Sequence, residues 1–259
     1  MKAVILAGGR GTRIAEESVS RPKPMITIGG RPILWHVMKI YAAHGVTDFI
    51  ICLGYKGYMI KEFFANFLLH AAESVEFDLV NNSVNMETNQ TENWKVTLVE
   101  TGINTQTGGR LKRIKPWVEN EEAFCMTYGD GVADVDISAL IAYHRKHGRF
   151  ATMTTVAPPG RFGTVELEDG KVTRFVEKPA AGHQVINGGF FVLSPKVFDY
   201  INGDDSTWEY DPLQNLAAEQ QLNAFQHTGF WQPMDTIRER EILEGYCASG
   251  TPPWLARRQ

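Results

Sequence analysis

A glycine-rich stretch near the start of the chain holds the first residues whose types and spacing could do chemistry. It reads Leu6-Ala-Gly-Gly-Arg-Gly-Thr-Arg13 and follows the short apolar run Ala3–Leu6. Closely spaced glycines let backbone N–H groups approach and bind an anion. Arg10 and Arg13 add guanidinium groups suited to bidentate contacts with phosphate. The stretch predicts a phosphate-binding loop, although a tight turn with two exposed arginines would give the same pattern.

Two familiar phosphate motifs do not fit this loop. The dinucleotide fingerprint G-x-G-x-x-G would require glycine where Ile14 stands. The Walker motif ends in Gly-Lys-Ser or Gly-Lys-Thr, and neither tripeptide occurs in the chain. These mismatches disfavour hydride transfer and P-loop ATP hydrolysis.

A lysine between two prolines follows the loop. Pro22 and Pro24 keep Lys23 out of a helix and fix the backbone around it. An ammonium held near phosphates could balance the negative charge that develops in phosphoryl transfer. Taken alone, Lys23 would more simply be a surface lysine in a stiff loop.

One aspartate is placed to bind a metal ion. Asp130 follows the apolar run Phe124–Tyr128 and stands between Gly129 and Gly131. A carboxylate at the end of a strand, with glycine on both sides, can reach a cation without obstruction. Magnesium prefers such hard oxygen ligands and often takes one or two carboxylates.

Three other aspartates have simpler explanations. Asp235 precedes the helix expected from Thr236, where a plain helix N-cap is the simpler interpretation from sequence. Asp134 and Asp136 form a D-x-D pair like that of metal-dependent glycosyltransferases. They are better explained as acids at the start of the helix from Ile137, where they complement the helix dipole.

The elements that must position these residues alternate between strand and helix in the first half of the chain. Strands are expected at Ala3–Leu6, Phe49–Leu53, Trp94–Glu100 and Ala123–Tyr128, and helices at Ile33–His44, Met59–His70 and Ile137–His147. The second half has the short strands Thr152–Val156, Gly163–Leu167, Lys171–Glu177 and Gly188–Leu193, and the helices Leu213–Glu219 and Thr236–Ser249. Alternation predicts a mostly parallel sheet with helices on both faces, which binds ligands at the carboxyl ends of its strands.

The sequence thus predicts an α/β fold with a Rossmann-like, mostly parallel (mixed) sheet flanked by helices and a β-rich C-terminal part. We expect one domain over residues 1–259. Asn81–Asn93 is polar and irregular, and we predict a mobile loop there, of the kind that often forms a binding lid or a subunit contact.

Composition restricts the classes of protein. The 259 residues include 26 Lys and Arg against 30 Asp and Glu, a formal net charge of −4, and no basic block suggests general nucleic-acid binding. No run reaches the ~18 apolar residues of a membrane span, and the apolar run before Gly8 is too short for a signal-peptide core. Cys52, Cys125 and Cys247 form no C-x-x-C motif, so we expect free thiols and the reducing cytoplasm.

Together the motifs resemble the signature of the sugar-nucleotide pyrophosphorylases, a nucleotidyltransferase family. The resemblance rests on Leu6–Arg13 with Lys23-Pro24, and on Tyr128–Gly131, Phe162-Gly163, Glu177–Pro179, Asn187–Gly189 and Trp231–Asp235. The combination of Thr107–Arg113, Gly129–Asp134 and Phe230–Asp235 is similar to the branch that takes CTP and glucose 1-phosphate. The resemblance implies a nucleotide-binding part over about 1–135 and a sugar-binding part over 136–259.

The resemblance also implies a role for each matching residue. It makes Arg13, Lys23 and Asp130 catalytic, and Asp130 and Asp235 ligands of Mg²⁺. Residues implied to bind the nucleotide are Leu6, Ala7, Gly8, Gly9, Arg10, Gly11, Thr12, Arg13, Thr105, Gly109, Arg110 and Gly129. Residues implied to bind the sugar phosphate are Lys23, Gly163, Glu177, Lys178 and Asn187.

The implied reaction is attack of a phosphate oxygen on the α-phosphorus of CTP, which makes CDP-glucose for deoxysugars of a surface polysaccharide. It requires no general base, because a phosphate monoester has its second pKa at ~6 and is already anionic. The implied partners are these substrates and further copies of the chain, with a hexamer as the expected assembly. We expect neither nucleic acid nor a membrane as a partner. The alternatives are the same reaction with UTP or dTTP, a metal-dependent glycosyltransferase using Asp134 and Asp136, and a non-catalytic sugar-nucleotide-binding regulator.

Overall fold

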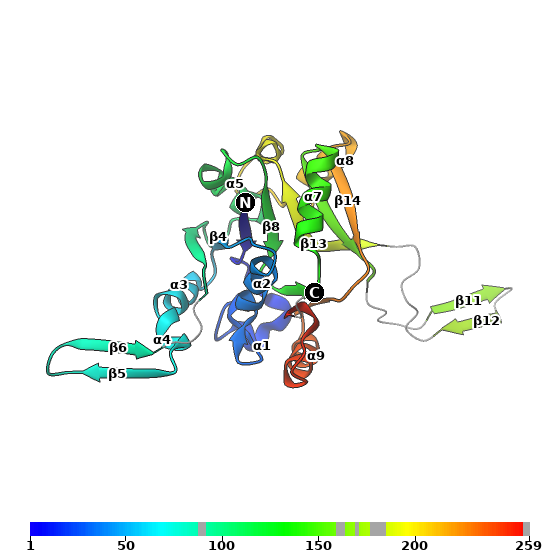
Figure 1. Cartoon of the computed structure of the whole chain (residues 1–259). Helices are drawn as coiled ribbons and strands as arrows, with labels where there is room; N and C mark the ends of the chain where they lie inside the picture. Colours follow the sequence, from blue (N-terminus) through cyan, green and yellow to red (C-terminus); the bar gives the residue numbers. More distant parts are fainter. Residues whose placement is uncertain (88–91, 159–163, 169–170, 177–184, 256–259) are drawn as a thin grey trace.

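A central sheet of seven strands organises the molecule (Figure 1). The computed structural model describes residues 1–87, 92–158, 164–168, 171–176 and 185–255 of the chain. Only the path of the backbone is described for residues 13, 15, 16 and most of 164–176. The strand order is β14-β10-β13-β8-β1-β4-β7. The strands are β1 (Lys2–Leu6), β4 (Asp48–Leu53), β7 (Lys95–Glu100), β8 (Phe124–Tyr128), β10 (Ala151–Val156), β13 (Ile186–Leu193) and β14 (Leu222–His227).

The sheet is mostly parallel with one reversed strand. β1 runs parallel to β4 and β8, β4 to β7, and β10 to β14. Strand β13 lies antiparallel between β8 and β10. The predicted mixed, mostly parallel sheet is confirmed, and both halves of the chain contribute strands to it.

Helices cover both faces, which explains why the strands read as continuous apolar runs. In β1, Ala3 and Ile5 join the apolar cluster on one face, while Val4 and Leu6 join the cluster on the other. The first cluster receives side chains from α2 (Ile33–Ala42), α7 (Ile137–His147) and α9 (Ile237–Ala248). The second receives them from α5 (Thr107–Arg113), α6 (Lys115–Val118), η3 (Pro195–Tyr200) and α8 (Asp211–Ala218).

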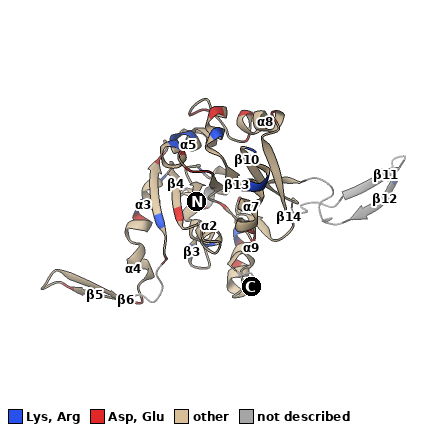
Figure 2. Cartoon of the chain, turned by 45° about the horizontal axis from the view of Figure 1, so that its top comes forward, with Lys and Arg blue, Asp and Glu red and all other residues tan. Residues whose placement is uncertain are grey.

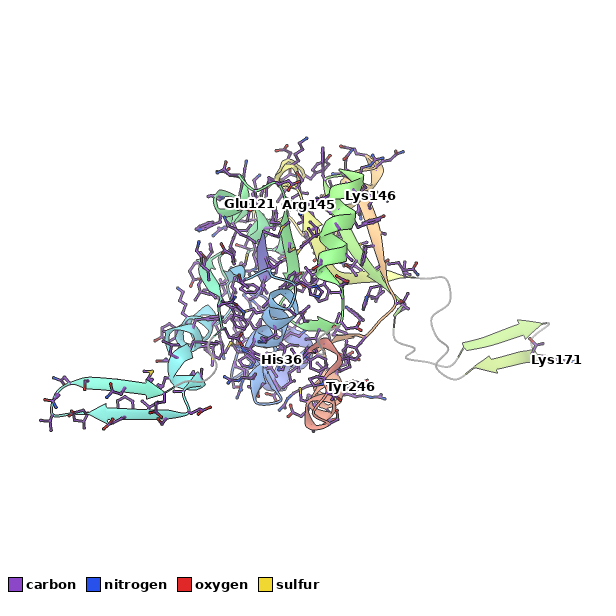
Figure 3. All side chains as sticks on the ribbon, in the orientation of Figure 1. His36, Glu121, Arg145, Lys146, Lys171 and Tyr246 are labelled. Carbon is purple, nitrogen blue, oxygen red and sulfur yellow. The ribbon has the colours of Figure 1, made fainter. Side chains whose placement is uncertain are left out.

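The C-terminal segment packs back onto α2. Trp254, in the 3₁₀ turn η4 (Pro253–Leu255), donates from its indole Nε1 to Nδ1 of His36 at 3.1 Å. The other ring nitrogen of His36 lies 2.9 Å from the carbonyl oxygen of Ile28. His36, labelled in Figure 3, is buried in α2.

Two antiparallel ribbons project from opposite sides of the body (Figure 1). One pairs β5 (Ser74–Asp78) with β6 (Ser83–Glu87), and the other pairs β11 (Thr164–Glu168) with β12 (Lys171–Val176). The second ribbon agrees with the predicted strands there, although its turn at 169–170 lies outside the described residues.

The prediction of an irregular loop over Asn81–Asn93 is wrong in part. Ser83–Glu87 is strand β6, with Ser83 opposite Asp78 and Glu87 opposite Ser74. Val84 and Met86 alternate with polar neighbours, which is the period of a strand. The polar composition of the whole segment concealed this short alternation, and residues 88–91 lie outside the described part.

Other differences from the sequence-based expectation are local. The helix expected over Met59–His70 is two helices, α3 (Gly57–Ala65) and α4 (Phe67–Ala71), which meet at Asn66. Strand β14 was not expected. Two short antiparallel strand pairs were also not predicted from the sequence. These are β2 (Thr27–Ile28) with β3 (Arg31–Pro32), and β9 (Gly131–Ala133) with β15 (Trp231–Pro233).

Charged residues are distributed over many elements. Figure 2 shows Lys and Arg interspersed with Asp and Glu across the described part of the chain, rather than gathered in one basic stripe. Within the described residues, no helix combines the length and apolar character needed to cross a membrane.

Candidate active site

The glycine-rich loop leaves β1 at the carboxyl edge of the parallel strands and is held there by its neighbours. The Ala7 N–H donates to the carbonyl oxygen of Cys52 in β4 at 3.1 Å. Gly11 has a φ of 64°, in the left-handed region that favours glycine. A Cβ on Gly11 would lie 3.3 Å from the Cβ of Lys23. The loop and Lys23 therefore pack directly against each other.

A 3₁₀ turn, η1 (Thr12–Ile14), follows the loop. The Ser18 hydroxyl donates to the Gly11 carbonyl at 3.0 Å and fixes the return of the chain. The backbone of Arg13 lies in this turn, and its side chain is outside the description.

The solvent side of the loop carries Arg10. Its Nη2 donates to Oδ1 of Asn104 at 2.9 Å, so the guanidinium reaches the segment that leads to α5. A Cβ on Gly9 would meet no atom within 4 Å, which leaves open space over this part of the loop. A triphosphate could approach the backbone here.

Arg110 fastens the loop from inside the protein. Its side chain, in α5, donates to the carbonyl oxygens of Gly8, Leu53 and Gly102 and to the Thr101 hydroxyl, at 2.7–3.0 Å. Arg110 is only 5% exposed, and burial lowers the pKa of its guanidinium below the usual value. Every acceptor is neutral, so this buried cation is held by dipoles at the ends of β4 and β7 and in the loop.

Two further residues from the predicted nucleotide side lie beside Arg110. Thr105 is buried. A Cβ added to Gly109 would lie 2.7 Å from the methyl group of Thr105. Only glycine at position 109 therefore allows this close packing.

Lys23 joins the two aspartates predicted to bind a metal. Its Nζ donates to Oδ2 of Asp130 at 2.7 Å and to Oδ1 of Asp235 at 2.6 Å. The three residues are distant in sequence, and the side chains of both aspartates are partly exposed. The structure thus brings together two carboxylates and one ammonium beside the glycine-rich loop.

Strand pairing explains how the two aspartates meet. β9 pairs antiparallel with β15, and Gly131 lies opposite Pro233. The Met234 N–H donates to the Asp130 carbonyl at 2.8 Å, which continues the pairing by one step. Asp235 is the residue directly after Met234, so the pairing brings its carboxylate close to that of Asp130. Gly129 anchors the other end of this segment, because its N–H donates to the carbonyl of Leu6 at 3.1 Å.

Helix capping does not account for Asp235. The N-cap of α9 is Thr236, whose hydroxyl accepts from the Glu239 N–H at 3.2 Å in a capping box. The Asp235 N–H donates to the Glu239 carboxylate at 2.7 Å. The interpretation of Asp235 as a plain N-cap is therefore wrong by one residue, and its carboxylate points to Lys23 instead.

The electrostatics of this cluster suit a divalent cation. Burial would lower the pKa of the Lys23 ammonium, but the carboxylates of Asp130 and Asp235 outweigh it and raise the pKa above its usual value. Two carboxylates around a single ammonium leave one excess negative charge. They fit Mg²⁺, which takes one or two protein carboxylates and completes its shell with water and phosphate. Among the described residues no group of three or more His, Cys, Asp and Glu is arranged to hold a metal.

Of the residues predicted to bind the sugar phosphate, the structure describes Lys23, placed above, and Asn187. Asn187, in β13, donates from Nδ2 to the Tyr128 hydroxyl at 3.4 Å, and its Oδ1 accepts from the Gly189 N–H at 2.8 Å. The other predicted sugar-side residues, Gly163, Glu177 and Lys178, lie outside the described residues. Tyr128 was not singled out from the sequence, although it stands directly before Gly129 in a quoted motif.

The D-x-D pair has structural partners. Asp136 caps α7, where its Oδ1 accepts from the Ala139 N–H at 2.8 Å. Asp134 Oδ1 lies 3.0 Å from Nε2 of His227. These contacts agree with a structural role for both acids.

Comparison with known proteins identifies relatives over almost the full chain. Residues 2–236 match the family described as Nucleotidyl transferase. A glucose-1-phosphate cytidylyltransferase from Salmonella typhi is 55% identical over 254 residues, which cover 98% of each chain. A probable glucose-1-phosphate cytidylyltransferase from Bacillus subtilis is 47% identical over 255 residues, covering 98% of this chain and 99% of the relative.

A solved structure agrees with the fold. The crystal structure of HddC from Yersinia pseudotuberculosis superposes with a TM-score of 0.67 at 24% identity, over 96% of this chain and 99% of the other. At this identity the likeness concerns the fold alone.

Proposed function

Since the chain belongs to the nucleotidyl transferase family, we propose that it transfers a cytidylyl group from CTP to glucose 1-phosphate and releases pyrophosphate. The two bacterial relatives described above, named for this activity, support the choice of substrates. The observation that carries the proposal is the meeting of Lys23, Asp130 and Asp235 beside the glycine-rich loop.

The chemistry is a substitution at phosphorus. An anionic phosphate oxygen of glucose 1-phosphate forms a bond to the α-phosphorus of CTP. The bond from that phosphorus to the oxygen of the β-phosphate breaks, and pyrophosphate leaves with the electron pair. The chain has to position the reactants and balance negative charge. We assign this balance to Lys23 and Arg13, and the binding of the triphosphate to the loop N–H groups and Arg10.

Asp130 and Asp235 would hold Mg²⁺. When bound, the ion would supply positive charge at the phosphate oxygens and fix their geometry. Lys23 keeps the two carboxylates together, and it places an ammonium at the same point of the site. We assign the sugar phosphate to Lys23, Gly163, Glu177, Lys178 and Asn187, and the nucleotide to the part before residue 136 of a single domain.

We infer a homo-oligomer from the ribbon β5–β6. Its side chains Phe77, Leu79 and Val80 are 58%, 85% and 91% exposed. Apolar side chains gathered at the end of a projecting ribbon favour burial against another protein surface. A second copy of the chain is the expected occupant, within a hexamer.

We place the enzyme in the cytoplasm, as a source of CDP-glucose for deoxysugars of a surface polysaccharide. The free thiols of Cys52, Cys125 and Cys247 support a reducing compartment. The charge pattern supports neither nucleic acid nor membrane as a partner.

The experiment is pyrophosphate release from glucose 1-phosphate and Mg²⁺, with CTP, UTP, dTTP and ATP compared side by side. Release with CTP alone is the expected result. Preference for UTP or dTTP would keep the reaction class and overturn the base assignment. Absence of release with all four nucleotides would overturn the proposal and favour the glycosyltransferase or the non-catalytic regulator.

A further inference from the structure

A carboxylate outside every motif quoted above lies between two hydroxyl groups of the site. Glu209 stands in the loop before α8, and its Oε2 accepts from the Thr107 hydroxyl at 2.6 Å. Its Oε1 accepts from the Tyr128 hydroxyl at 2.5 Å. Thr107 begins α5, and Tyr128 ends β8. One side chain therefore contacts two elements that are distant from it in sequence.

The contact with Thr107 belongs to a tightly packed junction. The Trp208 N–H donates to the Thr107 hydroxyl at 2.9 Å, and the Gly109 N–H donates to the Ser206 carbonyl at 3.1 Å. A Cβ on Gly108 would lie 2.7 Å from that same Ser206 oxygen. The first turn of α5 thus packs so closely on the segment 204–209 that a side chain at position 108 would clash with it.

Helix α5 passes this constraint on to the glycine-rich loop. Arg110 lies one turn after Thr107 on the same helix, and its Nη2 donates to the Gly8 carbonyl at 3.0 Å. Because Arg110 is buried and both Nη1 and Nη2 donate hydrogen bonds, a shift of α5 would move the loop expected to hold the nucleotide.

The contact with Tyr128 leads to the sugar side. The Tyr128 hydroxyl donates to Glu209 and receives a hydrogen bond from Asn187. The Tyr128 ring also lies against Gly189, where a Cβ would come within 2.9 Å of Cδ2.

We propose that Glu209 is a positioning residue that fixes the nucleotide side and the sugar side of the site relative to each other. It acts through Thr107 and α5 on one side and through Tyr128 and Asn187 on the other. The inference rests on the proposed function, because it needs two substrates that meet between these elements.

The chain offers a matched control for the Tyr–Glu contact. The Tyr200 hydroxyl donates to Oε2 of Glu219 at 2.5 Å, the same chemistry at the same distance as Tyr128 and Glu209. The Tyr200 pair is exposed and joins the last residue of η3 to Glu219, the C-cap of α8. Tyr200→Phe therefore removes an equivalent hydrogen bond without affecting the network.

The test measures KM for each substrate, kcat and the melting temperature for five variants and the wild type. Tyr128→Phe should raise KM for glucose 1-phosphate at least about tenfold and KM for CTP less than about twofold, because a hydrogen bond to a charged group is lost on the sugar side. Thr107→Val should show the opposite split, and Thr107→Ser should restore the wild-type values. Glu209→Gln keeps one acceptor for two hydroxyls, so it should raise both KM values. Tyr200→Phe should change none of them.

Several outcomes would overturn the inference. If Glu209→Gln leaves both KM values unchanged in an active enzyme, as Tyr200→Phe should, the inference is overturned and the proposed function stays intact. If Glu209→Gln lowers kcat and the melting temperature without changing either KM, Glu209 has only a structural role. If the wild type does not turn over, calorimetric binding of CTP and of glucose 1-phosphate to the same variants decides the inference separately. A wild type that neither turns over nor binds would overturn both.

Discussion

Nη2 of Arg110 lies 3.0 Å from the carbonyl oxygen of Gly8, so a buried cation supports the glycine-rich loop from inside the protein. A Cβ at position 8 would lie 2.1 Å from Nη1 of the same side chain. Gly8 and Arg110 are therefore a matched pair: the absence of a side chain in the loop is what admits the guanidinium behind it.

We expect Arg110→Met to destabilise the protein by about 3 kcal/mol, because it leaves several buried acceptors unsatisfied. It should also raise KM for CTP through movement of the loop. Urea denaturation and initial rates measure the two effects. Arg145→Met, in α7, removes an exposed contact with Glu122 and is the control, for which we expect little change in either quantity. Equal changes in the free energy of unfolding and in KM for CTP in the two variants would contradict the role of the buried hydrogen bonds of Arg110.

We expect Asp130→Asn and Asp235→Asn each to lower kcat by about 10²–10³-fold, because each removes a charge from the proposed Mg²⁺ site. Rates over a range of Mg²⁺ concentrations measure the loss, and higher Mg²⁺ should restore part of it. Asp136→Asn is the control, since asparagine also caps a helix well, and it should stay within about twofold of the wild type. A larger effect at Asp136 than at Asp130 would favour the glycosyltransferase alternative.

His36 should make the free energy of unfolding depend on pH. Burial lowers its pKa to about 4 from the ordinary value of 6.5, and Nδ1 accepts from Trp254 only when it is unprotonated. The unfolded chain binds the proton first, so stability is full above pH 6.5 and is lost as the pH falls toward 4. The contribution of His36 lost between pH 7.5 and pH 5 should be about 2 kcal/mol.

Urea denaturation at these two pH values tests this dependence. His36→Asn should reduce the difference between them, while His70→Asn, at an exposed position, should leave it unchanged. An unaltered pH dependence in His36→Asn would assign the effect to other groups.

The projecting ribbon should control assembly. Replacing Leu79 and Val80 together by Lys should reduce the mass in solution, because it places charges in the expected subunit contact. Light scattering after gel filtration measures the mass. Val19→Lys changes another apolar side chain that is 73% exposed, and it should leave the mass unchanged. A monomeric wild type, or an unchanged mass in the double variant, would contradict the proposed contact.

Local patterns in the sequence identified the sheet and several of the residues that the structure brings together at its edge. Lys23 and Asp130 stand beside prolines and glycines that mark them directly. Asp235 was harder, because a residue before a helix resembles a cap, and only the pairing of β9 with β15 brings it close to Asp130.

Contacts between distant segments leave no local pattern. Glu209 meets Thr107 and Tyr128 through the packing of one loop on a helix and a strand end, and no spacing in the sequence indicates this. Strand β6 was missed because its alternation covers only five residues. The role of Arg110 as a support became visible only when its acceptors, spread over three segments, were located.

The place of β13 between β8 and β10 has a consequence for biosynthesis. Strand β8 lies in the first half of the chain, yet its partner on one side is Ile186–Leu193. While the ribosome makes the intervening residues, the nascent sheet β7-β4-β1-β8 carries an open edge at β8 with unpaired N–H and C=O groups. Such an edge is a template for pairing with a foreign strand. The reversed strand therefore completes the sheet and also covers this edge. A chain interrupted before residue 186 would be left prone to aggregation.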